Sequence, residues 1–344
     1  MLARGGEPGR VNRPLVRALG DAGLLGRLFD GVSALELCIV REALAQELTE
    51  AESAFALQGL GAFPIADAGT DAARERWVPA VAEGNAVAAF ALTEPGAGSD
   101  AAALALEARP EPGGYRLSGT KTFISNAPDA DVYTVFARTS AGTRSRGITA
   151  FVVPGDADGL EGEPIALLSP HPIGRLEFDG VFVAEDGRLG ERDRGFGVAM
   201  RTLDLFRPSV GAAAVGMAQA ALDAAVAYAG KREAFGKPLR ELQAVGHLLA
   251  EMATRTHAAR LTVHAAATAY DTGGSRITEL AAMAKLFATE VAQFVVDSAI
   301  QVHGAVALEE GHLLEHLYRD VRALRIYEGA SEVQREIIAR QLYL

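Results

Sequence analysis

The chain has 344 residues, of which 49% are hydrophobic and 22% are charged, and its formal net charge is −11. This length and composition predict a large hydrophobic core divided among two or three domains. The negative charge argues against a nucleic-acid groove and against an anionic membrane surface. A single cysteine, Cys38, excludes a disulfide framework, and the seven histidines lack the spacing of metal ligands, so we expect no metal site.

The N-terminal quarter reads as helical. Residues 1–9 are polar and glycine-rich, and we expect them to be disordered. Apolar spacing predicts a helix over 13–28, broken near Gly20 and Gly23, and a longer helix over 35–58. Asp71 is expected to cap a helix over 71–83. We find no apolar run long enough to span a membrane and no signal-peptide core, which indicates a soluble, cytoplasmic protein.

The sequence pattern changes from helical to strand-like after residue 86. Runs of β-branched and aromatic residues bounded by Gly, Pro and Asp predict strands over 115–123, 132–137, 148–153 and 176–183. They favour an antiparallel sheet or small barrel. Helical spacing then returns over 210–231, 242–270 and 277–303, as in an antiparallel bundle. The order of helices, strands and helices indicates an α+β fold, and no G-x-G-x-x-G motif supports a Rossmann site.

A glycine-rich octet, Thr93-Glu94-Pro95-Gly96-Ala97-Gly98-Ser99-Asp100, follows the apolar run 88–92. Its proline and glycines fix a loop whose backbone groups, with the hydroxyls of Thr93 and Ser99, suit the edge of a heteroaromatic ring. Taken alone, the octet is explained equally well as a tight turn between two elements.

Near the C-terminus, Glu328 stands before Gly329 in Arg325-Ile326-Tyr327-Glu328-Gly329-Ala330-Ser331. Glycine permits a positive φ and a close backbone approach, and Ser331 is expected to cap a final helix. A carboxylate on such a turn is well placed as a general base. Taken alone, however, the stretch fits a surface glutamate beside a helix cap better.

The octet and five later motifs together resemble the acyl-CoA dehydrogenase family, in the family's order and near its spacing. The later motifs are Lys121–Asn126, Leu203–Pro208, Lys231–Leu239 with Gln243, Gln301–Gly304 and Tyr327–Ser331. The resemblance covers about residue 10 to the C-terminus. It implies an α+β fold with an N-terminal helical domain over 1–87, a middle antiparallel β-barrel over 88–190 and a C-terminal four-helix bundle over 191–344.

The resemblance implies a bound FAD, with Ser125 near flavin N5 and with Arg232 and Phe235 supplied by a neighbouring subunit. The cofactor-binding residues that it implies are Phe90, Leu92, Thr93, Gly98, Ser99, Phe123, Ile124, Ser125, Arg232, Phe235, Gln243, Gln301, Gly304 and Ser331. The substrate-side residues are Ser99, Asp204, Arg207 and Gly329. Without the resemblance, Arg232 reads as a helix-end charge, Phe235 as a core aromatic and the two glutamines as solvated residues.

The reaction that the resemblance implies is α,β-dehydrogenation of an acyl thioester, of CoA or of an acyl carrier protein. Glu328 would take the α-proton while FAD N5 takes the β-hydride, and burial should raise the pKa of Glu328. Some relatives place the base just before the Arg-Pro pair, where Phe206 cannot serve, which leaves Asp204 as a distant candidate. An electron-transferring flavoprotein is the expected acceptor, and a homotetramer or homodimer the expected assembly. An acyl-CoA oxidase and a non-catalytic flavin- or acyl-binding protein are the alternatives.

The chain departs from the family pattern at several places. Ala305 and Ala307 stand in the glycine-rich segment after Gly304, Ala330 and Glu332 replace a threonine and a glutamine, and Phe123 replaces a tryptophan. The loop Ser169-Pro170-His171-Pro172-Ile173-Gly174 suggests an altered acyl carrier or pocket mouth. The family's first helix is expected to be missing or vestigial.

Overall fold

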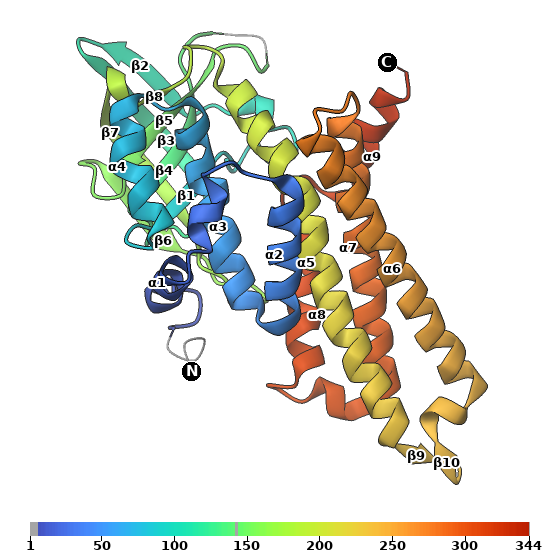
Figure 1. Ribbon diagram of the computed structural model, residues 1–344. Coiled ribbons are helices and arrows are strands. Elements are labelled where there is room, and N and C mark those ends of the chain that lie inside the picture. The colour runs from blue at the N-terminus through green and yellow to red at the C-terminus, as the bar shows by residue number, and fades with distance from the viewer. Residues whose placement is uncertain (1–5, 142–143, 344) are drawn as a thin grey trace. The chain divides into compact units, whose positions relative to one another are not determined.

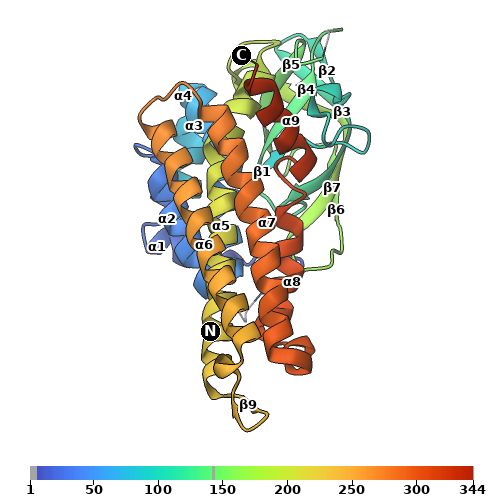
Figure 2. The same ribbon diagram turned by 90° about the vertical axis from the view of Figure 1, so that its right-hand side faces the viewer.

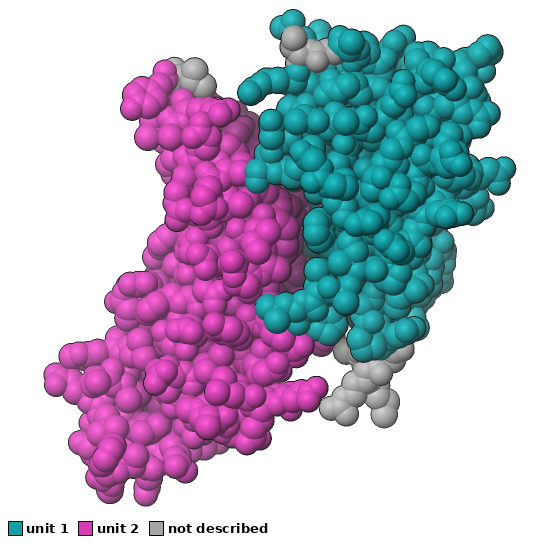
Figure 3. All heavy atoms as spheres, turned by 180° about the vertical axis from the view of Figure 1, so that it is seen from behind, with its two compact units in different colours: residues 1–32, 53–203 teal, residues 33–52, 204–344 magenta. Residues whose placement is uncertain are grey.

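The computed structural model describes residues 6–141 and 144–343, so most of the expected disordered segment lies outside the described residues. The chain forms two compact units, which Figure 3 shows in different colours. One unit contains residues 1–32 and 53–203, and the other contains residues 33–52 and 204–344. Residues 33–52 therefore belong with the C-terminal helices, although they lie within the N-terminal quarter of the sequence.

The N-terminal helices are shorter and more numerous than expected. They are α1 (Arg13–Asp21), η2 (Leu25–Leu28), α2 (Ala34–Glu47), α3 (Thr49–Ala68) and α4 (Asp71–Ala82). The single helix expected over 35–58 is two helices, because Leu48 is extended with φ −160° and ψ 103°. The expected cap at Asp71 is wrong: Thr70 is the N-cap of α4, and its hydroxyl accepts a hydrogen bond from the Ala73 N–H.

The middle of the chain forms a sheet of eight strands within the described residues (Figure 1). Strands β6, β7, β3, β2, β4, β5 and β8 are neighbours in that order, and β1 pairs with β4. The β1–β4 and β2–β4 pairings are parallel, and the other pairings are antiparallel. The strands are β1 (Ala88–Ala91), β2 (Glu107–Glu111), β3 (Gly114–Ser125), β4 (Val132–Arg138), β5 (Ile148–Pro154), β6 (Leu160–Pro164), β7 (Ile173–Ala184) and β8 (Arg188–Leu189).

Helix α3 packs on this sheet through a closely approached glycine. A Cβ atom on Gly61 would lie 2.5 Å from the backbone nitrogen of Ala89 in β1. The core between them is apolar and includes Ala62, Ile65, Val81, Ala88, Val132, Phe136, Ile148 and Ala150. The sheet and its covering helices thus place the loop after β1 and the end of β3 on a rigid support.

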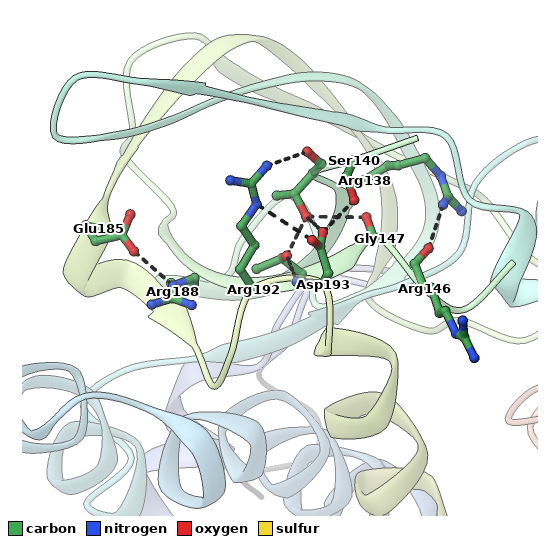
Figure 4. Close-up of polar contacts among 10 residues, drawn as sticks. Arg138, Ser140, Arg146, Gly147, Glu185, Arg188, Arg192 and Asp193 are labelled. Atoms are coloured by element: carbon green, nitrogen blue, oxygen red, sulfur yellow. Dashed lines mark hydrogen bonds and ion pairs between the residues drawn. The ribbon is translucent and has the colours of Figure 1, made fainter. Parts of the chain in front are cut away.

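A polar cluster ties the loop between β4 and β5 to the segment before α5 (Figure 4). The Asp193 carboxylate accepts hydrogen bonds from the hydroxyls of Thr139 at 2.7 Å and Ser140 at 2.8 Å. The Arg192 guanidinium donates to the Thr139 carbonyl at 3.2 Å. Burial raises the pKa of Asp193, but these two hydroxyls and Arg192 outweigh it and the pKa is lowered.

The second unit is built on long helices that lie side by side, as Figure 2 shows for α5, α6 and α7. The elements after the sheet are α5 (Gly195–Lys231), β9 (Glu233–Ala234), β10 (Lys237–Pro238), η5 (Leu239–Glu241), α6 (Gln243–Asp271), α7 (Ile277–His303), η6 (Gly304–Leu308), α8 (Leu313–Leu324) and α9 (Ser331–Gln341). Helix α7 has the predicted bounds. Helix α5 begins before its predicted start and runs through Pro208.

Within residues 6–141 and 144–343, two helical stretches are long and apolar enough to cross a membrane, contrary to the expectation from the sequence. They are Gly195–Lys231 and Ile277–Leu308, and the most apolar windows are 72% and 44% buried inside the protein. A buried core helix meets the same criterion of length and composition. These stretches are rich in small residues that let helices approach: a Cβ on Gly211 would lie 2.9 Å from a Val263 side-chain carbon and 3.1 Å from the Ala284 carbonyl oxygen.

Candidate active site

Glu328 lies on the turn between α8 and α9, as predicted. Its φ is 52°, and the φ of Gly329 is 97°, so two consecutive residues adopt left-handed backbone conformations. A non-glycine residue seldom adopts this conformation and is strained by it, so the surrounding structure must hold it in place. The expected cap at Ser331 is wrong: Ala330 is the N-cap of α9, and the Ser331 hydroxyl donates to Glu290 at 2.7 Å.

Three side chains hold the carbonyl groups of this turn. The Lys285 ammonium donates to the Gly329 carbonyl oxygen at 2.7 Å, and the Arg207 guanidinium donates to the Glu328 carbonyl oxygen at 3.2 Å. The Gln334 amide donates to both oxygens, at 3.1 Å and 2.9 Å. Lys285 is fully buried, so the hydrogen bond to the Gly329 carbonyl replaces contacts that its ammonium would otherwise make with water. These contacts hold the backbone of Glu328 and Gly329 in place. None of them involves the side chain of Glu328.

Within the part of the chain that the structure describes, one oxygen of the Glu328 carboxylate makes no hydrogen bond that would have to break before it accepts a proton. Its Oε2 atom is buried and has no hydrogen-bond partner among the described residues. Burial raises the pKa of Glu328, and the cations Arg41, Lys285 and Arg207 counteract that rise only in part. A carboxylate with a buried, unpartnered oxygen and a raised pKa has the properties of a general base.

Arg41 is a member of this cluster that the sequence did not reveal. Its guanidinium is buried, contacts the Glu52 carboxylate at 2.6 Å and donates to the Ser209 hydroxyl at 2.7 Å. The signal available in the sequence was an arginine within the apolar helix over 35–58, but its partners could not be named.

Asp204, the other candidate base, already has two polar partners. Its carboxylate forms an ion pair with Arg207 at 3.5 Å and accepts a hydrogen bond from the Thr278 hydroxyl at 3.0 Å.

The candidate flavin residues of the other unit come from two segments that are joined to each other. The Thr122 N–H donates to the Thr93 carbonyl at 3.0 Å. The ammonium of buried Lys121 contacts the Leu92 carbonyl at 3.0 Å and the Glu94 carboxylate at 2.8 Å. Glu94 also accepts from the N–H groups of residues 105 and 106, at 2.6 and 2.9 Å. Burial lowers the pKa of Lys121 to about 8. This ion pair was not predicted.

Some of the candidate flavin residues on these two segments are buried in the protein, and others are exposed to solvent. Leu92 and Ile124 are buried, and Phe90 packs against Phe136 with ring centroids 4.9 Å apart. Phe123 is 57% exposed and has a φ of 54°. Gly98 and Ser99 are exposed, whereas Thr93 and Ser125 are half-buried. An exposed aromatic ring on the same joined segments as hydroxyl groups fits a planar heteroaromatic cofactor, which needs a stacking surface and polar contacts at its edge.

The remaining candidate residues lie at the far end of α5. From Arg207 to Lys231 a helix rises by about 36 Å, so one chain does not bring Arg232 to Glu328. Arg232 lines a hollow of about 430 Å³ with Lys231, Tyr228 and His303. Phe235 is at the tip of the β9–β10 hairpin and is 91% exposed, so it is not a core aromatic. Gln243, Gln301 and Gly304 are also exposed. Arginine and lysine in a hollow suit phosphate groups.

The chain matches the three domains of one family along almost its whole length. Residues 3–85 match the N-terminal domain, residues 89–181 the middle domain and residues 193–343 the C-terminal domain of acyl-CoA dehydrogenase. The protein belongs to the acyl-CoA dehydrogenase family and is an oxidoreductase of that family. The expected order of an N-terminal helical domain, a middle β domain and a C-terminal helical domain is confirmed. The middle sheet is not wholly antiparallel as expected, because β4 pairs in parallel with β1 and β2.

Individual relatives agree with this assignment. Cyclohexane-1-carbonyl-CoA dehydrogenase of Geobacter metallireducens is 35% identical over 97% of this chain and 90% of its own length. The short-chain specific acyl-CoA dehydrogenase of Bos taurus mitochondria is 41% identical over 81% of this chain and 68% of its own. The caffeyl-CoA reductase-Etf complex subunit CarC of Acetobacterium woodii is 37% identical over 81% and 74%.

Solved structures show the same architecture. Butyryl-CoA dehydrogenase from Megasphaera elsdenii superimposes with a TM-score of 0.91 at 34% identity, covering 98% of this chain and 91% of that one. An FAD complex of PigA superimposes with a TM-score of 0.93 at 27% identity, with the same shares of the two chains covered.

Proposed function

We propose that the protein is an FAD-dependent acyl-CoA dehydrogenase in which Glu328 removes the α-proton of an acyl-CoA thioester. The observation that carries this proposal is the buried, unpartnered Oε2 atom of Glu328 on a clamped, left-handed turn. A base that accepts no hydrogen bond needs no reorganisation before it takes a proton. The raised pKa of Glu328 brings its basicity closer to that of the weakly acidic α-carbon.

The residues around Glu328 then have distinct tasks. Glu328 takes the proton, and its own backbone N–H is the donor that we assign to the thioester oxygen as charge develops there. Arg207, Lys285 and Gln334 hold the backbone that carries both groups. FAD, when bound, accepts the hydride that leaves the β-carbon.

The cofactor would be held by residues of two chains. Phe123, Thr93 and Ser125 would contact the ring system from one subunit. Arg232 and Phe235 of a neighbouring copy would contact the pyrophosphate and adenine. The exposure of Phe235 supports this arrangement, because a ring that is 91% exposed on one chain is accessible to a neighbouring copy, and covering its apolar surface there would be favourable. A homotetramer or homodimer in the cytoplasm is the assembly that we propose.

The acceptor of the electrons is proposed to be an electron-transferring flavoprotein. The relative CarC is named as a subunit of a reductase-Etf complex, which supports this acceptor. Its name also describes a reductase, the reverse of dehydrogenation, so both directions need to be assayed.

The decisive experiment compares Glu328→Gln with Glu332→Gln, whose wild-type carboxylate is on the same segment but largely exposed. Each purified protein is characterised by its absorbance spectrum and then titrated anaerobically with a panel of acyl-CoA thioesters. We expect Glu328→Gln to keep its yellow colour and its acyl binding but to lose flavin bleaching. Glu332→Gln should bleach as the wild type does. Rapid bleaching of Glu328→Gln would refute the assignment of the base.

The same preparation separates the alternatives. Hydrogen peroxide formed without an added acceptor would identify an acyl-CoA oxidase. A protein that takes up no FAD would be a non-catalytic member of the family. Enoyl-CoA added to the chemically reduced enzyme reports the reverse direction, and the panel of acyl groups reports the preferred chain.

A further inference from the structure

A loop that departs from the family pattern, Ser169–Gly174, contacts a candidate flavin residue. The Nε2 atom of His171 lies 2.9 Å from the hydroxyl oxygen of Ser125. Ser125 is the last residue of β3, and both side chains are half-buried. The two prolines that flank His171, Pro170 and Pro172, limit the backbone conformations of the loop.

The backbone fixes this contact on both sides. Ser125 pairs with Ile173 in the β3–β7 ladder, and the Asn126 N–H donates to the Pro172 carbonyl at 2.7 Å. Gly174 allows the strands to approach, because a Cβ there would lie 2.7 Å from the Ala127 carbonyl oxygen. The backbone pairing next to His171 therefore holds its side chain close to Ser125.

A serine hydroxyl has one proton to donate and two lone pairs that accept. If the Nε2 atom of His171 carries a hydrogen, it donates to Ser125 and leaves the serine proton free. If Nε2 is bare, it takes that proton, and Ser125 can only accept. The state of one ring nitrogen therefore decides whether Ser125 can act as a donor elsewhere.

We propose that His171 is a positioning residue whose Nε2–H donates to Ser125 and so directs the single hydroxyl proton of Ser125 toward the flavin. This inference rests on the proposed function, in which Ser125 lies beside the flavin ring. A donor there stabilises the negative charge that reduction adds to the ring, so the contact raises the reduction potential of the bound cofactor.

The test measures the midpoint potential of the bound flavin in four variants. Ser125→Ala and His171→Leu should each lower the equilibrium constant for two-electron reduction about tenfold, which is about 30 mV. His171→Gln keeps a side-chain N–H donor and should stay within about twofold of the wild type. In the double variant, His171→Leu should add nothing to Ser125→Ala. A wild-type potential in His171→Leu, or additive shifts in the double variant, would overturn the proposal.

A second measurement needs neither the cofactor nor a folded leucine variant. Protein labelled with ¹⁵N in histidine, compared with His171→Gln, identifies the ring signals of His171 by NMR. We expect a hydrogen on Nε2, and a bare Nε2 would contradict the inference by itself. A protein that takes up no FAD but shows the Nε2 hydrogen would instead count against the proposed function and leave the His171–Ser125 contact standing.

Discussion

The ammonium of Lys285 and the carbonyl oxygen of Gly329 are 2.7 Å apart, and this contact places a buried cation one residue from the candidate base. Lys285 lowers the pKa of Glu328, in opposition to the effect of burial. Lys285→Met should therefore raise the pKa of Glu328 and move the acidic limb of the pH–rate profile to higher pH.

Stopped-flow flavin reduction by substrate between pH 5 and 9 measures this shift. Burial lowers the pKa of Lys285 to about 8, so the loss of rate should be largest below pH 8, where the wild-type ammonium is charged. Lys285→Arg keeps the charge and is the control. An unmoved profile in Lys285→Met would show that the lysine does not set the basicity of Glu328.

The buried pair of Lys121 and Glu94 should be sensitive to the loss of either partner. Lys121→Met leaves the Glu94 carboxylate buried without its cation and should lower the free energy of unfolding by about 3–5 kcal/mol. The double variant Lys121→Met with Glu94→Gln should recover much of that loss, because no unpaired charge remains. Urea unfolding of the two proteins at pH 7 makes the comparison. If the double variant is as unstable as the single one, the pair does not act as an ion pair.

Gly329 and Gly311 form a matched pair of glycines with positive φ, 97° and 86°. A Cβ on Gly329 would collide with the Gln334 amide, whereas a Cβ on Gly311 would meet nothing within 4 Å. Gly311→Ala should cost only about 1–2 kcal/mol of backbone strain. Gly329→Ala should cost more and should also slow flavin reduction about 10- to 100-fold, because Gln334 holds the Glu328 carbonyl. Equal rates in the two variants would contradict this.

Two glycines within α5 should respond to alanine in opposite directions. A Cβ on Gly216 would collide with the Glu42 carbonyl of α2, and one on Gly230 would meet nothing within 4 Å. Gly230→Ala should stabilise the protein by about 0.5–1 kcal/mol through helix propensity alone. Gly216→Ala should destabilise it, because α2 must move away. Thermal unfolding measures both, and a stabilising Gly216→Ala would mean that α2 packs less tightly than described.

Elements with an uninterrupted apolar repeat could be predicted closely. Helix α7 has the predicted bounds because the repeat of its apolar residues is unbroken over Ile277–His303. The sequence predicts helical spacing only from residue 210, whereas α5 begins at Gly195 and contains Pro208. The helix continues through it, since burial of Leu205, Phe206 and Val210 outweighs the lost backbone hydrogen bond. Helix α8 was overlooked, although Leu314, Leu317, Val321 and Leu324 repeat at helical spacing.

The candidate site was predictable where it depends on local chemistry. The turn at Glu328 followed from its glycine neighbour, and the raised pKa of Glu328 followed from the expectation of burial. The contacts of Lys121 with Glu94 and of Arg41 with Ser209 join residues far apart in the sequence. Nothing in a local pattern identifies such partners, because they are brought together only by the packing of the whole fold.

Phe123 and Glu328 share a backbone property with a practical consequence for engineering. Both adopt a left-handed φ, 54° and 52°, that glycine would adopt without strain. A library selected only for heat resistance would therefore favour glycine at these positions, and it would lose an aromatic surface in one case and a base in the other. Thermostable descendants of this protein should be selected for turnover and for melting temperature together.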